Sequence, residues 1–195
     1  MNPLLFLDFE TTGLNPHVHL PLEVGVFCDS SGVQTEAHWL LAVDVADALA
    51  RADEFVQNMH AESGLWDDLL APPADEPLIE RAALEGTLCA WWAQYAREAA
   101  PKGRKPWIAG WNPAFDLGWL RVHAPSFAAV CDYHTFDLST LKQTCRAVYP
   151  GEVGPTLDAR GRHRALSDCR SAVAYWRWYR SHVMSPYGRN AGGGA

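Results

Sequence analysis

The alternation of apolar and polar residues divides the chain into a strand-rich beginning and a longer part in which strands alternate with helices. Three apolar stretches come first, at residues 4–9, 23–28 and 37–43. A Ser-Ser-Gly segment between the last two stretches is typical of a hairpin turn. The beginning of the chain therefore predicts a three-stranded antiparallel meander.

Helical periodicity begins after Asp44, and a long apolar helix pattern covers residues 78–100. Short strands are expected at 107–111 and 133–136, and further helices at 112–123, from a cap at Asp137 or Ser139 onward, and at 165–182. A meander followed by alternating strands and helices predicts an α/β fold, a ribonuclease H-like mixed five-stranded sheet flanked by helices. We expect a single domain over residues 1–184 and a disordered, Gly-rich tail over 185–195.

Composition narrows the function classes. The chain has 195 residues, of which 48% are hydrophobic, enough for one sizeable core. Its net charge of -7 argues against a broad, sequence-independent grip on long duplex DNA. The five cysteines contain no C-x-x-C pattern, which indicates neither a disulfide framework nor a zinc site. The apolar run at the N-terminus is interrupted by Asp8 and is neither a signal peptide nor a membrane span, so we expect a cytoplasmic protein without a membrane partner.

The segment LDFETTGL, residues 7–14, places two carboxylates in an apolar strand. Successive side chains of a strand alternate between faces, so Leu5, Leu7 and Phe9 share one face while Asp8 and Glu10 share the other. Like charges side by side at the end of an apolar strand are unfavourable unless a cation neutralises them. The pair predicts a metal site, although Asp8 facing water and Glu10 ending the strand would explain this spacing as well.

Two later segments carry further polar residues. In NPAFDLGWL, Asp116 lies in the first turn of a helix that follows a buried strand, where it also suits the positive end of the helix dipole. In HRALSDCR, His163 and Asp168 are five positions apart and would not share a face of a regular helix. They converge only if His163 precedes the helix, and Gly161 in the preceding segment favours such a loop. Alone, each residue is as readily an ordinary surface or capping side chain.

Together, the segments LDFETTG, NPAFD and HRALSD resemble, in order, the three motifs of the DEDDh (DnaQ-like) family of 3'-5' exonucleases. The resemblance implies that Asp8, Glu10, Asp116 and Asp168 ligate two divalent metal ions, Mg²⁺ or Mn²⁺, and that His163 is the general base. Two such ions stabilise the attacking and leaving oxygens of a phosphodiester hydrolysis, hard cations prefer oxygen ligands, and histidine titrates near neutrality.

The segments NMHAESGL and YHTFDLSTLK are similar to parts of oligoribonuclease, which cleaves very short oligonucleotides. In that family a leucine and a histidine sandwich the terminal base, matching Leu14 and His60, while a tyrosine and a serine near the phosphates match Tyr133 and Ser139. The family's arginine that closes over the 5' phosphate is His134 here, a weaker and pH-dependent anion partner. Strict dinucleotide preference is therefore not expected to follow from the resemblance.

Arginines crowd the third motif, and Arg162 and Arg164 are the candidate phosphate contacts among them, although a solvated helix face would also explain such residues. The candidate substrate-binding residues are Thr11, Gly13, Leu14, His60, Asn112, Phe115, Tyr133, His134, Ser139, Arg162 and Arg164. Most of the nine tryptophans are expected in the core rather than stacked on bases.

The sequence thus predicts a metal-dependent 3'-5' exonuclease acting on short single-stranded RNA or DNA. A proofreading or DNA-repair exodeoxyribonuclease is the alternative, since NPAFDLGWL looks more like the proofreading enzymes than like oligoribonuclease. A binding or interaction module without catalysis would need a defect hidden behind five intact motif residues. Resemblance to oligoribonuclease also suggests a homodimer, and the residues do not decide between RNA and DNA.

Overall fold

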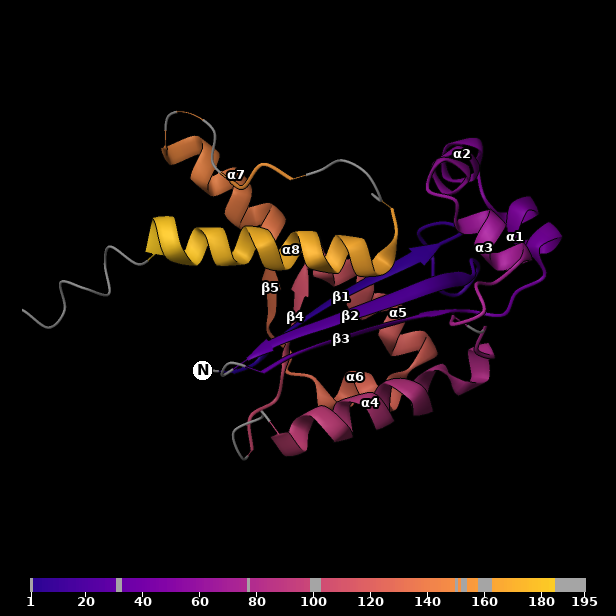
Figure 1. Ribbon diagram of the computed structural model, residues 1–195, viewed down its shortest axis with the longest axis horizontal. Coiled ribbons are helices and arrows are strands. Elements are labelled where there is room, and N and C mark those ends of the chain that lie inside the picture. The colour runs from indigo at the N-terminus through magenta and orange to yellow at the C-terminus, as the bar shows by residue number, and fades with distance from the viewer. Residues whose placement is uncertain are drawn as a thin grey trace, which may run out of the picture.

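The computed structural model describes residues 2–30, 33–76, 78–98, 103–149, 151, 154–157 and 163–184 (Figure 1). Four expectations lie outside these residues, namely the tail over 185–195, the centre of the Ser-Ser-Gly turn at 31–32, the loop role of Gly161 and the phosphate contact of Arg162.

A single mixed sheet forms the centre of the molecule (Figure 1). Its strands are β1 (Leu4–Thr11), β2 (Pro21–Ser30), β3 (Val33–Leu40), β4 (Trp107–Gly110) and β5 (Thr135–Asp137). Their spatial order is β3-β2-β1-β4-β5. The pairs β1–β2 and β2–β3 are antiparallel, whereas β1–β4 and β4–β5 are parallel. The expected five-stranded mixed sheet beginning as a meander is therefore confirmed.

Helices cover both faces of the sheet. A further group of short helices packs where β2 begins and β3 ends. They are α1 (Val45–Arg51), α2 (Glu54–Glu62), α3 (Leu65–Leu70), the 3₁₀ turn η1 (Arg81–Ala83), α4 (Leu84–Glu98), α5 (Pro113–His123), α6 (Pro125–Val130), α7 (Leu138–Val148), α8 (Ala165–Tyr179) and the π-helical turn η2 (Arg180–Met184). Asp137 caps α7 by accepting a hydrogen bond from the backbone N–H of Ser139, 2.8 Å away. No helix of the described residues is long and apolar enough to cross a membrane.

The long helix begins later than its apolar pattern suggests. Residues 78–80 are extended rather than helical, because Ile79 pairs with the end of β3. Its backbone N–H donates to Leu40 O, and its carbonyl accepts from Ala42 N, both at 2.9 Å. These bonds satisfy the backbone before the turn η1 leads into α4. Helix α6 was not predicted from the sequence.

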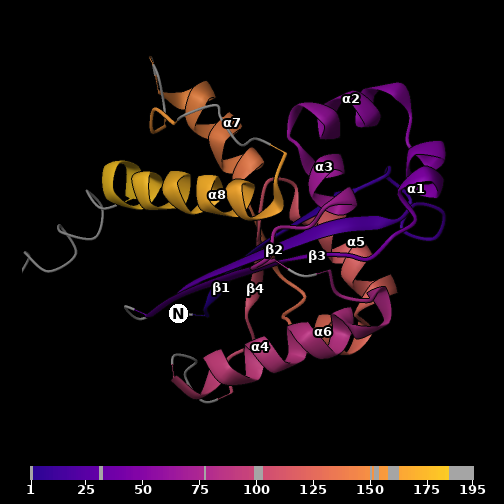
Figure 2. The ribbon, with the colours of Figure 1, turned by 45° about the vertical axis from the view of Figure 1, so that its right-hand side comes forward.

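The two faces of β1 belong to different cores. Leu5, Leu7 and Phe9 pack with residues of α4, α5 and α6, whereas Leu4 and Phe6 pack with α7 and α8. Because side chains alternate along a strand, Asp8 and Glu10 point to the face that carries α8. Figures 1 and 2 show α7 and α8 together on that face, with α4 and α6 on the opposite one.

Tryptophans fill these cores, as expected. Trp119 is completely buried between the sheet and α4–α6, and Trp92 and Trp176 are almost as inaccessible. All five cysteines lie in the described part of the chain and are reduced.

Candidate active site

Strand β1 brings two carboxylates to the sheet face beneath α8. Asp8 lies opposite Gly25 of β2 and Glu10 lies opposite Glu23. Glu10 is only 6% exposed. The expectation that Asp8 and Glu10 share a face is therefore confirmed, and α8 covers that face while Asp8 stays partly exposed.

Gly25 allows the first turn of α8 to approach this face closely. A Cβ atom at position 25 would lie 2.5 Å from the carbonyl carbon of Ala165 and 2.5 Å from the nitrogen of Leu166. Backbone atoms cannot yield as a flexible side chain can, so any larger residue at position 25 would displace the helix. The glycine thus places the start of α8 directly over Asp8.

Glu23 holds the same helix start from below. Its carboxylate accepts hydrogen bonds from Arg164 Nε and from the backbone N–H of Ala165, both at 3.1 Å, and lies 3.1 Å from His38 Nδ1. Burial alone would raise the pKa of Glu23, but His38, Arg164 and Ala165 together hold this pKa below its ordinary value. Sequence reasoning missed Glu23, although a charged residue in the apolar run PLEVGVFC was a usable signal.

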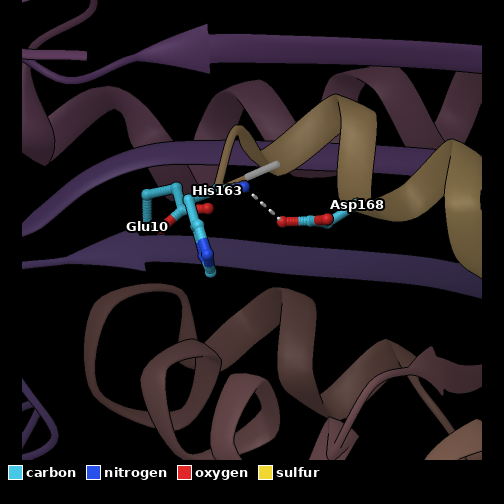
Figure 3. A group of neighbouring side chains, drawn as sticks. All are labelled: Glu10, His163 and Asp168. Carbon is cyan, nitrogen blue, oxygen red and sulfur yellow. Dashed lines mark hydrogen bonds between the residues drawn. The ribbon is translucent and has the colours of Figure 1, made fainter. Parts of the chain in front are cut away.

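His163 precedes α8, as its spacing from Asp168 predicted. Its backbone is left-handed, with φ of 59°, and its backbone N–H donates to Asp168 Oδ2 at 3.1 Å. This bond turns the residue back over the helix start, so that ligand atoms of Glu10, His163 and Asp168 all lie within 4.8 Å of one another. In Figure 3, Glu10 and Asp168 lie on either side of His163.

Asp116 comes from the first turn of α5 and is 2% exposed. Its Oδ1 accepts a hydrogen bond from the backbone N–H of Phe9, between the two acidic residues of β1, at 3.0 Å. Asn112, at the cap before Pro113, is left-handed with φ of 59°. Among the described residues, Asn112 and His163 are the two non-glycine positions with positive φ, and each precedes a helix that carries an acidic site residue.

The acidic residues raise one another's pKa. Burial is the main cause for Asp8, whose pKa lies well above its ordinary value, and Asp116, Glu10 and Asp168 add to the effect. Burial and the neighbouring carboxylates raise the pKa of Glu10 to about 9, and burial raises that of Asp116 to about 7. Buried carboxylates that disfavour ionisation together are stabilised by a cation.

This donor set fits a hard divalent cation. Carboxylate oxygens are the ligands that Mg²⁺ and Mn²⁺ prefer, and no thiolate takes part among the described cluster residues. A cation held there could polarise a phosphate and activate a water molecule beside a histidine, which is the arrangement that metal-assisted phosphodiester hydrolysis requires.

Comparison with curated proteins decides the family. The chain is 31% identical over 183 residues to the oligoribonuclease of Vibrio vulnificus, covering 93% of this chain and 95% of that protein. The chain belongs to the oligoribonuclease family. The oligoribonucleases of Photobacterium profundum and Aromatoleum aromaticum are 28% and 31% identical over 184 and 185 residues, covering 93% and 94% of this chain and 96% and 95% of theirs.

Solved structures support the fold. Escherichia coli exonuclease I in a metal-free complex with single-stranded DNA superposes with a TM-score of 0.65 at 16% identity, covering 97% of this chain. Exonuclease I from Methylocaldum szegediense gives a TM-score of 0.62 at 15% identity over 97% of this chain. The chain spans 42% of each of these longer proteins. No family model matches the sequence.

The segment after β1 presents a leucine at the edge of the cluster. Leu14 is 82% exposed, so the residue that matches the base-contacting leucine of oligoribonucleases is free of the core. A Cβ at Gly13 would lie 2.5 Å from the ring of His19, so a larger residue there would require that ring to move. Thr11 is buried, and its hydroxyl donates to Gly13 O at 2.8 Å, which fixes this turn.

His60 does not present the ring face that base stacking needs. It is completely buried in α2, where its ring meets Trp66 edge-on with centroids 5.4 Å apart. Its Nε2 lies 2.9 Å from Thr11 O, and because a carbonyl only accepts, Nε2 carries the hydrogen. Its Nδ1 has no hydrogen-bond partner among the residues that the structure describes, and it lies 3.8 Å from Glu10 Oε2. The structure thus places His60 behind a candidate metal ligand rather than against a base.

The residues that match the phosphate-contacting segment of oligoribonucleases lie between β4 and α7. Tyr133 is 81% exposed, and Ser139 is half-buried in the first turn of α7. His134, at the position of the family's arginine, is engaged elsewhere: its ring stacks on Trp107 at 5.1 Å, and its Nδ1 lies 2.7 Å from Asp132 Oδ1. Phe115 of α5 is half-buried against Trp119, with ring centroids 6.0 Å apart.

Of the two arginines predicted to contact phosphate, the structure describes only Arg164. Arg162 lies outside the described residues. Arg164 is already paired, because its Nε lies 3.1 Å from Glu23 Oε2 and its Nη1 lies 2.6 Å from Asp68 Oδ2. A guanidinium held by two carboxylates braces the start of α8 and has little capacity left for a phosphate. The structure therefore argues against a phosphate contact by Arg164.

Proposed function

We propose that the protein is a metal-dependent 3'-5' exonuclease that hydrolyses short single-stranded oligonucleotides to nucleoside 5'-monophosphates. The observation that carries this proposal is the convergence of Asp8, Glu10, Asp116 and Asp168 beside His163, in surroundings that raise the pKa values of Asp8, Glu10 and Asp116. Membership of the oligoribonuclease family supports it, since the curated relatives carry that name.

The four carboxylates would hold two divalent ions, Mg²⁺ or Mn²⁺, which supply charge stabilisation for the attacking and leaving oxygens. His163 would accept a proton from the attacking water, whose oxygen forms the new bond to phosphorus as the bond from phosphorus to the 3' oxygen breaks. The exposed side chain of Leu14 would bear on the terminal base, while Tyr133 and Ser139 would contact the phosphates.

A second candidate, a single-strand exonuclease acting on longer DNA, is favoured by one feature. On the side of the site where the 5' phosphate of a substrate would lie, position 134 is a histidine instead of the family's arginine. The imidazole of His134 contacts Asp132 and Trp107. A site whose 5' side is not closed over a phosphate accepts a longer strand.

Product identity and the role of His163 test the proposal together. Chromatography of reactions on a dinucleotide should show nucleoside 5'-monophosphates in Mg²⁺ or Mn²⁺ and none with chelator. His163→Ala should reduce turnover on the order of 10²-fold or more, with metal affinity nearly unchanged in a calorimetric titration. A loss of metal affinity in this variant would reassign His163 as a ligand, and products carrying a 3' phosphate would contradict the proposed reaction.

The resemblance to oligoribonuclease also supports a homodimer as part of the proposal. Light scattering after size-exclusion chromatography should give twice the chain mass of 21.6 kDa. A mass of one chain at all concentrations would contradict it.

A further inference from the structure

Helix α7 carries a row of polar and basic side chains that begins at the edge of the candidate active site. Ser139, Lys142 and Arg146 are separated by three and four positions and therefore lie on one face of the helix. The row spans about 10 Å along the axis, from a rise of about 1.5 Å per residue. Asp137 fixes its beginning, since its Oδ1 accepts from the backbone N–H groups of both Ser139, at 2.8 Å, and Asn112, at 3.4 Å.

Two aromatic rings lie beside this row. Trp111, which immediately precedes Asn112, and Tyr175 of α8 meet edge-on with ring centroids 5.0 Å apart. Both are half-buried, and Lys142 Nζ lies 5.2 Å from the Trp111 ring centroid and 4.7 Å from that of Tyr175. Tyr175 follows Asp168 by seven positions on α8, so it lies on the same helix face about 10 Å further from the acidic cluster. In both views α7 and α8 are neighbours (Figures 1 and 2).

In the described part of the chain, no carboxylate pairs with the basic residues of this row, and Lys142 meets only the two aromatic rings. Arg164, Arg170 and Arg177 all pair with carboxylates. Among the described residues, neither Lys142 nor Arg146 forms an ion pair, and Arg146 is exposed. Arg146 and Tyr175 also line a cavity of about 340 Å³ together with Gly154 and Leu157. Cations, aromatic faces and a cavity large enough for a base are the features by which proteins hold single-stranded nucleic acid.

We propose that this surface, defined by Trp111, Lys142, Arg146 and Tyr175, is a binding track for the 5' part of strands longer than a dinucleotide. The inference rests on the proposed function, and it extends the substrate class to single strands of four or more nucleotides. Lys142 and Arg146 contact successive phosphates upstream of Ser139, and the two rings support a base. About 10 Å of helix accommodates roughly two nucleotides of an extended strand.

The test uses the full chain with Asp8→Asn, which prevents hydrolysis, and a 5'-fluorescein-labelled twelve-nucleotide strand. Anisotropy titrations over a range of salt concentrations compare this protein with the same protein carrying both Lys142→Met and Arg146→Glu. This double variant is the track variant. Methionine retains an unbranched stem over the rings while removing the charge. Each phosphate contact on a single strand contributes a slope of about 0.7 in a plot of log K against log salt. We expect the slope to fall by about 1.4 and affinity at low salt to fall on the order of tenfold.

The matched control carries Arg81→Glu and Arg104→Met, which together change the net charge by the same amount as the two substitutions of the track variant. Arg81 lies before α4 on the opposite face of the sheet, and Arg104 lies at the other end of β4 from Trp111; both are exposed. A control that loses as much slope as the track variant would overturn the track, as would an unchanged slope in both. If the double variant fails to fold, Arg146→Glu alone at its exposed position should lower the slope by about 0.7.

Dinucleotide hydrolysis separates this inference from the proposed function. With Asp8 intact, the track variant should cleave a dinucleotide at the wild-type rate, because that substrate ends before Lys142, while its KM for the twelve-nucleotide strand rises. Absence of hydrolysis in the wild-type protein would refute the proposed function, and the anisotropy result would still decide whether the track exists. An equal loss on both substrates would refute the track and indicate damage to the site itself.

Discussion

At the scale of single residues, the acidic cluster is the feature on which the proposed chemistry depends. Asp8 and Glu10 interrupt an apolar strand, and the fold buries Glu10 and Asp116 while Asp8 keeps part of its surface exposed. Burial is the main reason for the raised pKa values of Asp8, Glu10 and Asp116, and repulsion by neighbouring carboxylates adds to it for Asp8 and Glu10. A local loss of stability of this kind is common at functional sites and supports the proposed metal site.

Replacing one of these carboxylates should separate stability from activity. Asp8→Asn should abolish hydrolysis, because a metal ligand is lost, yet stabilise the metal-free protein by about 1 kcal/mol, because repulsion is relieved. The melting temperature in chelator should then rise by about 3 °C. Calorimetry in chelator and an oligonucleotide assay in Mg²⁺ measure the two effects. Retained turnover, or a lower melting temperature in chelator, would contradict the assignment of Asp8.

The pH dependence of metal stabilisation follows from the same shifts. Since the folded pKa values of Glu10 and Asp116, about 9 and about 7, exceed their unfolded values, the metal-free folded state binds more protons than the unfolded state. Its stability therefore falls as pH rises from about 4.5 toward 9. A bound cation favours the ionised forms, so the difference in melting temperature between saturating Mg²⁺ and chelator should widen from pH 6 to pH 9. A difference that stays constant or narrows would show that these carboxyls are not the metal ligands.

At the scale of elements, the site depends on how closely α8 approaches β2. The sequence predicted the helix, its position after His163 and the acidic residue it carries. It did not show that Gly25 would make room for the helix or that Glu23 would bind its first turn, because both depend on a contact between segments about 140 residues apart. The same limit explains Arg164, whose partners Glu23 and Asp68 are remote in sequence.

A methyl group at Gly25 should disturb the site from a distance. Gly25→Ala should destabilise the protein by about 1 to 3 kcal/mol, because the new Cβ would overlap the backbone of Ala165, and should lower turnover by shifting Asp168 and His163. Gly86→Ala in α4 is the control, since a Cβ there meets nothing within 4 Å and should stabilise by up to about 1 kcal/mol. Urea unfolding measures both. Equal and neutral effects would mean that α8 is not held against β2.

Two glutamates on neighbouring strands provide a second comparison at this scale. Glu23, 1% exposed in its side chain, pairs with Arg164, whereas Glu36, 35% exposed, pairs with Arg170. Glu23→Gln should cost about 3 kcal/mol, because it removes the buried one of the two carboxylates that pair with Arg164 and leaves only Asp68 as a charge partner. Glu36→Gln should cost no more than about 1 kcal/mol, since solvent screens that pair. Similar losses in urea unfolding experiments would remove the anchoring role from Glu23.

At the scale of the whole molecule, the meander and the mixed five-stranded sheet were predictable because they rest on local patterns. Alternation placed Asp8 and Glu10 on one face, and Asp116 was expected at a helix start that follows a buried strand. The surroundings of the candidate substrate-binding residues were less predictable. His60 is buried and His134 is bound to Asp132, although their positions in the sequence match residues that contact substrate in oligoribonucleases. Ring orientation depends on packing by side chains from other elements, which sequence position does not reveal.

The central claim is that the acidic cluster hydrolyses short single strands from the 3' end with divalent metal. A time course with 5'-labelled RNA and DNA strands, from dinucleotides to about twenty nucleotides, in Mg²⁺ and in Mn²⁺ and with Asp8→Asn as control, tests it most directly. The account predicts stepwise shortening from the 3' end by one nucleotide at a time, with dinucleotides cleaved to completion and no products from the control. Internal cleavage, products unchanged by chelator, or full activity in Asp8→Asn would contradict it.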